Sequence, residues 1–236
     1  MTALVLLPGM DGTVALRRDF VTALGSRAEC IVVPYPPGCA DGYAKPEGLV
    51  RSKLPSDRPY VLLGESFSGP IAISIAATRP SGLIGLVLCC SFARNPRPIL
   101  GSFRQLLPLL PFKLVPTGLL SSFVLGSFAT APLQSALRTA LSEIPAATLR
   151  ARVAAVMDAD VSSLLSSIQV PVLYLRGTYD RAVPRSCSDQ IARSIRQAKI
   201  VEINAPHFLL QAAPIRAADA VVDFLQALPP ASDAES

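Results

Sequence analysis

The sequence contains no tryptophan and only one histidine, His207, and both scarcities restrict what the chain can be. Aromatic residues amount to 6% of the 236 residues, so the hydrophobic core must be mainly aliphatic. One histidine and five cysteines without a Cys-x-x-Cys spacing cannot form a typical zinc site, so we expect no metal. Half of the residues are hydrophobic, and this composition excludes an intrinsically disordered chain.

The cysteines and the charges favour an intracellular protein without a nucleic-acid partner. Five cysteines cannot all pair, and Cys89 and Cys90 lie within an apolar run, which is typical of buried, reduced thiols. Residues 1–3 lack the basic residues that begin a signal peptide, so we expect a cytoplasmic location. The net charge is +5, but the basic residues are scattered, so no nucleic-acid-binding patch is expected.

Short apolar runs alternate with helical patterns along most of the chain. The runs cover residues 3–7, 30–33, 60–63, 84–89, 172–175 and 200–203, and the helical patterns cover about 14–25, 44–54, 67–79, 185–197 and 209–227. Continuous runs of this kind are typical of strands that are buried on both faces of a sheet. The alternation predicts an α/β fold with about six parallel strands, helices on both faces and right-handed crossovers.

Residues 92–167 interrupt this alternation. They contain no convincing strand, seven prolines, and seven basic against three acidic residues, which is +4 of the total +5. Because proline breaks helices, we expect short helices that form a cap inserted into the α/β core. The predicted division is residues 1–91 and 168–228 for the two parts of the core, 92–167 for the cap, and 229–236 for a frayed tail.

The middle of the predicted cap is weakly charged, since Lys113 is the only charged residue between Arg104 and Arg138. A transmembrane helix would need about 20 consecutive apolar residues, and four prolines between positions 108 and 132 interrupt any such span. We therefore expect no integral membrane segment and interpret this stretch as an apolar cover over a site. Peripheral contact with a membrane is the alternative.

The candidate nucleophile is Ser66, within the string Gly64-Glu65-Ser66-Phe67-Ser68-Gly69 between a predicted strand and a predicted helix. A tight strand-to-helix turn projects its central side chain above the sheet edge and needs small residues two positions to either side. Gly64 and Ser68 satisfy this spacing, although glycine is more common at the second position. Ser68 itself fits poorly as the nucleophile, because Ser66 and Pro70 would then flank it.

The candidate base is His207, because a serine hydroxyl needs an adjacent base to become a good nucleophile. His207 follows the last predicted strand, and Pro206 ends the strand pattern. The histidine is therefore predicted to lie in a loop at the carboxyl end of that strand. Ser66 is predicted at the same edge of the sheet, where the active sites of open α/β sheets gather.

The candidate acid is Asp180, since an imidazole base needs a carboxylate that orients it and stabilises its charged form. Asp180 follows the predicted strand 172–175 and therefore lies at the same sheet edge. Asp158 and Asp160 are alternatives, but both belong to the predicted cap. A carboxylate could also follow the strand 84–89, but residues 91–98 contain none.

Two backbone N–H groups are needed to hold the negative charge that develops on a substrate oxygen. The residue after the nucleophile, Phe67, is predicted to supply one. Gly9 and Gly12 allow the loop after the first strand to turn toward the site, and Met10 N–H is the predicted second donor. A nucleotide site is not expected here, because the GxGxxG motif is missing.

Taken together, the strings LLPGMDGT, VLLGESFSG, GTYDRAVP and APHFLLQ resemble the α/β-hydrolase superfamily over nearly the whole chain. The order Ser66, Asp180, His207 matches the nucleophile–acid–histidine order of that superfamily. Size and cap are similar to small bacterial carboxylesterases, in particular the pimeloyl-acyl-carrier-protein methyl ester esterase type. One departure is Pro8-Gly9 where the family commonly has His-Gly, which removes a side-chain hydrogen bond that often braces the loop.

The resemblance implies a serine hydrolase that cleaves carboxylic esters, with short to medium acyl chains, and needs no organic cofactor or metal. Acyl transfer or thioester hydrolysis on the same triad is an alternative, and so is a non-catalytic protein that only holds an acyl ligand. A dehalogenase would need an aspartate at position 66. Fold and motifs leave open the substrate and the oligomeric state.

The resemblance also implies an interpretation of the basic residues in the predicted cap. Arg138, Arg150 and Arg152 could attract an acidic acyl carrier protein to the entrance of the site. The alternative is that these arginines are solvated surface residues of an arginine-rich chain.

Overall fold

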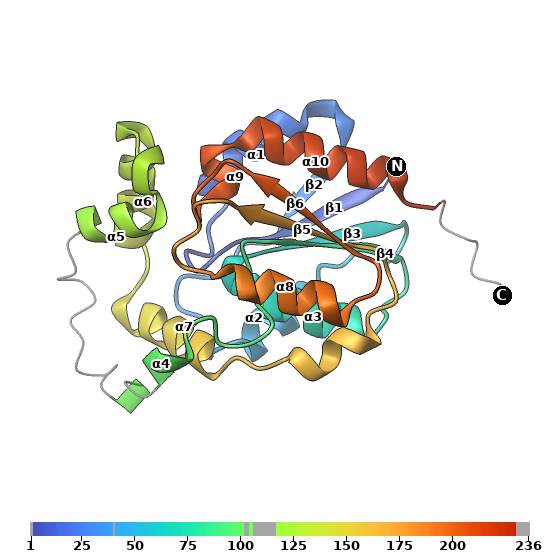
Figure 1. The fold of residues 1–236 in the computed structure, drawn as a ribbon, viewed down its shortest axis with the longest axis horizontal. Coiled ribbons are helices and arrows are strands. Elements are labelled where there is room, and N and C mark those ends of the chain that lie inside the picture. Colours follow the sequence, from blue (N-terminus) through green and yellow to red (C-terminus); the bar gives the residue numbers. More distant parts are fainter. Residues whose placement is uncertain (1, 40, 102–103, 106–116, 230–236) are drawn as a thin grey trace.

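The computed structural model describes residues 2–39, 41–101, 104–105 and 117–229, and its centre is a six-stranded sheet (Figure 1). All strand pairs are parallel, and the strand order is β2-β1-β3-β4-β5-β6. The strands are β1 (Ala3–Leu7), β2 (Glu29–Val32), β3 (Tyr60–Glu65), β4 (Leu83–Cys89), β5 (Val172–Gly177) and β6 (Ala198–Ile203). The predicted α/β fold with about six parallel strands is confirmed.

Helices cover both faces of the sheet, as the crossovers between parallel strands require (Figure 1). One face carries α1 (Arg18–Leu24), α9 (Leu209–Ala212) and α10 (Pro214–Ala227), and the other carries α2 (Ala44–Arg51), α3 (Gly69–Ala77) and α8 (Arg185–Ser194). Short 3-10 turns lie at η1 (Ala15–Arg17), η2 (Gly25–Arg27) and η3 (Ser66–Ser68). The sheet thus separates two aliphatic cores.

Strand β1 shows why the central strands are continuously apolar. Val5 and Leu7 pack into one core, Leu4 and Leu6 into the other, and all four side chains are fully buried. The edge strand β6 carries a charged residue on each face and is partly exposed. Burial of side chains from both faces of the inner strands therefore supplies the main hydrophobic stabilisation of the fold.

Two of the predicted helices are divided in the structure. The helix expected at 209–227 is two helices, α9 and α10, which meet at Ala213. Pro214 has no backbone N–H and is suited to the first turn of a new helix, which explains the break. The helix expected at 67–79 begins as the 3-10 turn η3 and becomes α-helical only at Gly69.

The described part of 92–167 contains helices and no named strand. Its elements are α4 (Pro98–Gly101), α5 (Thr117–Val124), η6 (Gly126–Phe128), α6 (Ala131–Ser142), α7 (Ala146–Asp158) and η7 (Ser162–Ser167). Its two ends lie side by side through an antiparallel bridge between Arg94 and Asp160 and a hydrogen bond from Val161 N–H to Ala93 O of 2.8 Å. This pairing brings the two ends of the segment 92–167 together.

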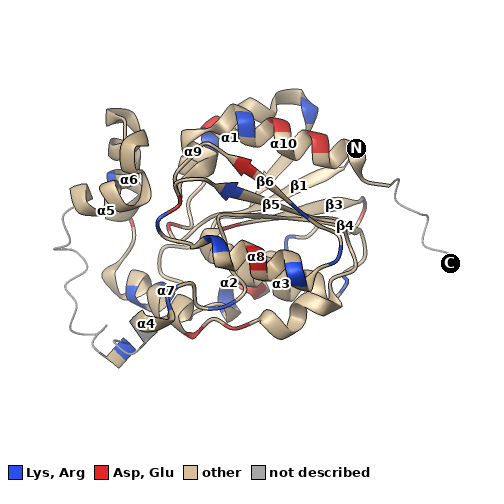
Figure 2. Cartoon of the chain, in the orientation of Figure 1, with Lys and Arg blue, Asp and Glu red and all other residues tan. Residues whose placement is uncertain are grey.

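Helices α5 and α6 form a lobe beside the carboxyl ends of the strands (Figure 1). Buried Val124, Leu125 and Leu137 form its core, and Phe208 packs against them. Figure 2 shows how little charge this lobe carries, and Arg138 is the one charged residue of α5 and α6. Part of the predicted apolar stretch, residues 106–116, and the predicted tail beyond Pro229 lie outside the described residues.

Within the described residues, no helix combines the length and the apolar character that a membrane span requires.

Candidate active site

Ser66 is the first residue of η3 and lies in a strained turn directly after β3. Its φ angle is +47°, in the left-handed region that costs a non-glycine residue roughly 1–2 kcal/mol. A Cβ atom on Gly64 would lie 2.8 Å from the Ser68 carbonyl oxygen, so only glycine fits where strand and helix meet. On the other side, Ser91 Oγ donates a hydrogen bond of 2.6 Å to Ser66 O. These neighbours hold the backbone of Ser66 in its strained conformation.

The structure brings Ser66, His207 and Asp180 together in one chain of hydrogen bonds. Ser66 Oγ lies 2.9 Å from His207 Nε2, and His207 Nδ1 lies 2.9 Å from Asp180 Oδ2. The second oxygen of Asp180 accepts the backbone N–H groups of Ala182 and Val183 at 2.8 and 2.9 Å. Each of these three side chains therefore has a hydrogen-bond partner that fixes its orientation.

The alternative acids lie elsewhere. Asp158 forms an exposed ion pair with Arg104, and Asp160 accepts hydrogen bonds from the backbone and side chain of Ser162. Neither carboxylate has a contact with His207.

The loops that carry Asp180 and His207 approach each other closely at Gly177. A Cβ atom at this position would lie 2.6 Å from the carbonyl oxygen of Pro206. Tyr179 N–H also donates to Ala205 O at 3.0 Å, which ties the two loops together. The acid and the base are thus placed by backbone packing as well as by their own hydrogen bond.

The electrostatics of the pair favour a charged imidazole. Burial lowers the pKa of His207, but the Asp180 carboxylate, its hydrogen bond and the more distant Glu65 outweigh burial, so the pKa lies above its ordinary value of about 6.5. Burial raises the pKa of Asp180, but His207 and two backbone N–H groups outweigh it and hold that pKa below its usual range. Asp180 is therefore ionised at neutral pH.

This shift gives a prediction for the pH profile. Only the neutral imidazole can accept the proton of Ser66, so activity falls as the pH decreases through the pKa of His207. Because that pKa is raised, the half-maximal point of kcat/KM is expected above pH 6.5. The measurement is kcat/KM for a p-nitrophenyl ester between about pH 5 and pH 9. A midpoint below 6.5, or a flat profile, would contradict the assignment of His207 as the base.

The two candidate oxyanion donors, Met10 N–H and Phe67 N–H, lie in the turns that follow β1 and β3. Phe67 N–H is in the first turn of η3, where an N–H group has no acceptor within the helix. Among the described residues, Met10 N–H has no hydrogen-bond acceptor. The carbonyl of the same peptide unit, Gly9 O, accepts Gly12 N–H at 3.0 Å. In a trans peptide the N–H points opposite to the C=O, so Met10 N–H points away from the turn.

Ser68 braces the loop of the candidate oxyanion donor Met10 (residues 8–13, called the oxyanion loop below), a contact that the sequence did not indicate. Its hydroxyl donates to Pro8 O and lies 2.6 Å from the hydroxyl of Tyr35. Ser68 stands where the motif commonly has glycine, and its hydroxyl donates a hydrogen bond to this loop. The loop lacks the histidine of the common His-Gly pair, which would otherwise brace it. Recognising this from sequence would have required knowing that β1 and β3 are neighbours, which brings residues 8 and 68 together.

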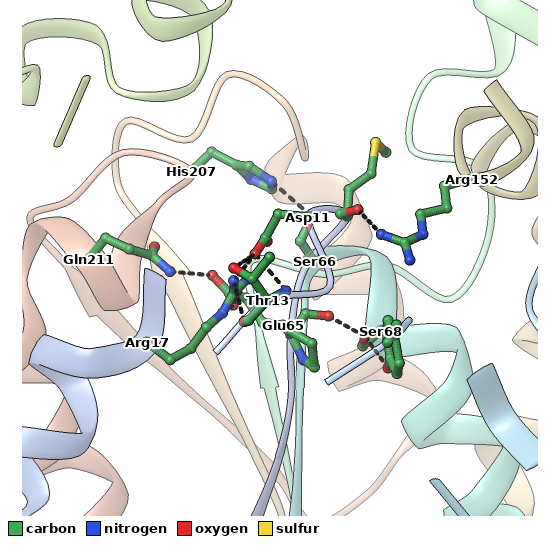
Figure 3. A network of polar contacts seen from close by, with 12 residues as sticks. Asp11, Thr13, Arg17, Glu65, Ser66, Ser68, Arg152, His207 and Gln211 are labelled. Atoms are coloured by element: carbon green, nitrogen blue, oxygen red, sulfur yellow. Dashed lines mark hydrogen bonds and ion pairs between the residues drawn. The ribbon is translucent and has the colours of Figure 1, made fainter. Parts of the chain in front are cut away.

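A buried ion-pair network lies below the same loop (Figure 3). Arg17 is fully buried and binds both Asp11 and Glu65, with Arg17 Nε 2.7 Å from Glu65 Oε2. Gln211 Nε2 donates to the other oxygen of Glu65 at 3.0 Å. Glu65 precedes the candidate nucleophile and Asp11 follows the candidate oxyanion donor Met10, so Arg17 links the two parts of the candidate site. Sequence reasoning missed this network, because Arg17 has the spacing of an ordinary helix residue.

Arg152 is not accessible at the entrance of the site, as the attraction of an acidic carrier protein would require. Its side chain is fully buried under α7, with Nη1 donating to Met10 O at 2.7 Å (Figure 3). An acidic carrier protein cannot contact this guanidinium. Of the three arginines considered, Arg138 is exposed and Arg150 is half-buried, so an electrostatic role of the cap would depend on those two.

One cluster among the described residues has the composition of a metal site. Ligand atoms of Cys90, Asp180 and His207 lie within 4.8 Å of one another. However, Nδ1 of His207 is already hydrogen-bonded to Asp180. Asp180 and His207 are therefore arranged as an acid–base pair, with Cys90 buried beside them.

Comparisons with known proteins place this geometry in context. Residues 4–223 match the Alpha/beta hydrolase family. Haloalkane dehalogenase 2 of Mycobacterium tuberculosis (strain ATCC 25618 / H37Rv) is 26% identical over 238 residues, which cover 88% of this chain and 82% of that protein.

Solved structures show the same fold. The enol-lactonase from Burkholderia xenovorans LB400 has a TM-score of 0.78 at 18% identity, with coverage of 95% of this chain and 91% of that chain. A hydrolase from Pseudomonas aeruginosa PA01 has a TM-score of 0.80 at 24% identity, with coverage of 96% and 90%. The structural likeness concerns the fold, and the family match extends over most of the sequence. The chain therefore belongs to the alpha/beta hydrolase family.

Proposed function

We propose that this protein is a serine hydrolase of carboxylic esters. The observation that carries the proposal is the chain of hydrogen bonds from Ser66 through His207 to Asp180, at the carboxyl edge of a parallel sheet. A strained serine, an oriented imidazole and an ionised carboxylate are the groups that acyl transfer to an enzyme nucleophile requires.

In the proposed mechanism, Ser66 Oγ attacks the ester carbonyl carbon while His207 Nε2 accepts its proton. The resulting oxyanion binds to Met10 N–H and Phe67 N–H, and Asp180 stabilises the imidazolium. Collapse of the intermediate breaks the bond to the alcohol, which leaves with the proton from His207. Water then attacks the acyl-enzyme with His207 as the base, and the acid and free Ser66 are released.

The serine at position 66 fits ester cleavage better than the dehalogenation after which the relative is named. Displacement of a halide through a covalent ester needs a carboxylate nucleophile, and this chain has a serine there. A purely ligand-binding role is also a poor explanation, because holding an acyl chain does not require a serine, an imidazole and a carboxylate in hydrogen-bonding contact.

The acyl chain of the substrate is proposed to lie under the lobe of α5 and α6. The aliphatic core of this lobe contacts Phe208, the residue next to His207. Phe208 N–H also donates to Val124 O at 3.4 Å, so the lobe reaches the loop of the base. An apolar surface at this place favours aliphatic acyl chains over charged ones.

A panel of p-nitrophenyl esters tests this assignment. Each methylene removed from water contributes about 0.8 kcal/mol, so kcat/KM is expected to rise by about fourfold per carbon over the first several carbons and then level off. Rates are expressed per active site, titrated with a fluorophosphonate. The same assays with added alcohol separate hydrolysis from acyl transfer, since a transferase gives a new ester. A kcat/KM that is flat, or that falls from acetate onward, would contradict the apolar acyl site.

A further inference from the structure

Arg152 makes contacts that the proposed reaction does not yet explain. It lies on α7, and its fully buried guanidinium donates from Nη1 to Met10 O at 2.7 Å and from Nη2 to Pro36 O at 3.4 Å. Its carbon Cζ also stands 5.9 Å from the centre of the Tyr35 ring. Helix α7 thereby reaches the loop that follows the first strand.

This buried cation has no carboxylate partner among the described residues. The other buried arginine of the site, Arg17, has two, Asp11 and Glu65. Arg152 instead binds backbone carbonyl oxygens and an aromatic face, and its Nε lacks an acceptor. Burying a charge is costly unless it is paired and hydrogen-bonded, so Arg152 is a poor choice for stability alone.

The contacts of the oxyanion loop indicate what Arg152 does in the site. The peptide unit that carries Met10 N–H lies between two units whose carbonyl groups are held, Pro8 O by Ser68 and Met10 O by Arg152. Ser68 comes from η3, whereas Arg152 comes from α7. Together with the hydrogen bond from Gly12 N–H to Gly9 O, these two anchors hold the peptide units on either side of the candidate donor.

Gly12 shows how closely the guanidinium is fitted to this loop. Gly12 has a φ of +73°, and a Cβ atom there would lie 2.8 Å from Arg152 Nη1. The turn that directs Met10 N–H away from the loop therefore closes directly against the guanidinium.

We propose that Arg152 is a positioning residue for the oxyanion hole, through which the seating of α7 on the core sets the rate of the reaction. The inference rests on the proposed ester hydrolysis. It predicts that Arg152 affects the transition state much more than substrate binding, because an oxyanion donor is used fully only when negative charge develops.

The test compares Arg152→Ala and Arg152→Lys with the matched control Arg150→Ala. Arg150 lies on the same helix, is half-buried and has no hydrogen bond to the loop among the described residues. Loss of an oxyanion donor typically costs about 10²–10³ in kcat, and loss of its positioning is expected to cost about 10–100-fold in Arg152→Ala. KM should change by less than about threefold, and with a neutral p-nitrophenyl ester, which needs no carrier protein, Arg150→Ala should match the wild type.

Three readouts separate positioning from a merely structural role. Rates are expressed per titrated active site, so that unfolded protein does not count. Affinity for a trifluoromethyl ketone, which adds to the serine and forms an oxyanion, should fall by the same factor as kcat/KM, whereas affinity for the product acid should not change. Guanidinium ion at about 0.05 M, far below unfolding concentrations, should partly restore Arg152→Ala.

Arg152→Lys keeps the test decisive if the alanine variant does not fold. Lysine retains the charge but cannot bind both carbonyl groups as the guanidinium fork does, so a loss of about 3–10-fold in kcat is expected. A kcat like that of the wild type in the folded Arg152 variants would overturn the proposal for Arg152. So would an equal loss of affinity for the ketone and for the product acid. Failure of the wild type to cleave any ester would instead overturn the proposed function.

Discussion

Replacing His207 with alanine is expected to lower kcat by about 10⁵-fold or more, while the protein stays folded. The structure contains no second imidazole, because the sequence has only one histidine. Without it, nothing removes the proton from Ser66 Oγ, and the chain of hydrogen bonds to Asp180 is interrupted. The measurement is kcat with a p-nitrophenyl ester, with thermal unfolding followed by circular dichroism as the check on folding.

Asn204→Ala is the matched control for His207→Ala. Asn204 is exposed in the same loop and makes no side-chain hydrogen bond among the described residues, so its replacement should leave kcat near the wild-type value. Activity of His207→Ala within tenfold of the wild type would remove the histidine from the mechanism.

Asp180→Asn is expected to lower kcat by about 10⁴-fold with little effect on folding. The asparagine can keep the shape of the residue but not its charge, so the imidazolium loses its counter-charge and the imidazole can adopt the wrong tautomer. The acid limb of the pH profile should also move to lower pH. Burial lowers the pKa of His207, and Asp180 is the main group that opposes it.

Asp158→Asn and Asp160→Asn provide the controls for the carboxylate. Both side chains are held by partners away from the site, Arg104 for Asp158 and Ser162 for Asp160. Each variant should keep kcat within about twofold of the wild type, as surface substitutions away from special features usually do. A large loss in either variant together with an active Asp180→Asn would place the acid in the segment 92–167.

The sheet could be predicted from the sequence because its signal is local. Each inner strand is a continuous apolar run, and each crossover has a recognisable helical pattern, as in Leu4–Leu7 and α10. The helix boundaries were less accurate, since the break before Pro214 and the 3-10 start at Ser66 depend on single residues. The candidate triad could be placed at one edge of the sheet, because Ser66, Asp180 and His207 each follow a strand and parallel strands end at the same edge.

The supporting contacts could not be predicted, because they join residues that are distant in sequence. The hydroxyl of Ser68 meets Pro8 O only because β1 and β3 are adjacent. Arg17 and Arg152 have the sequence appearance of surface residues, yet both are fully buried. Burial of a charge depends on the partners that tertiary packing supplies, and no pattern within one helix reveals them.

The central claim is that Ser66 is the nucleophile that forms the acyl-enzyme. Its most direct test is intact-mass spectrometry of the protein after reaction with a fluorophosphonate, followed by mapping of the modified peptide. We expect one adduct per wild-type chain, located on Ser66, and none in a folded Ser66→Ala variant. An adduct that persists in Ser66→Ala, on Ser68 or elsewhere, or an unlabelled wild type that still turns over esters, would contradict it.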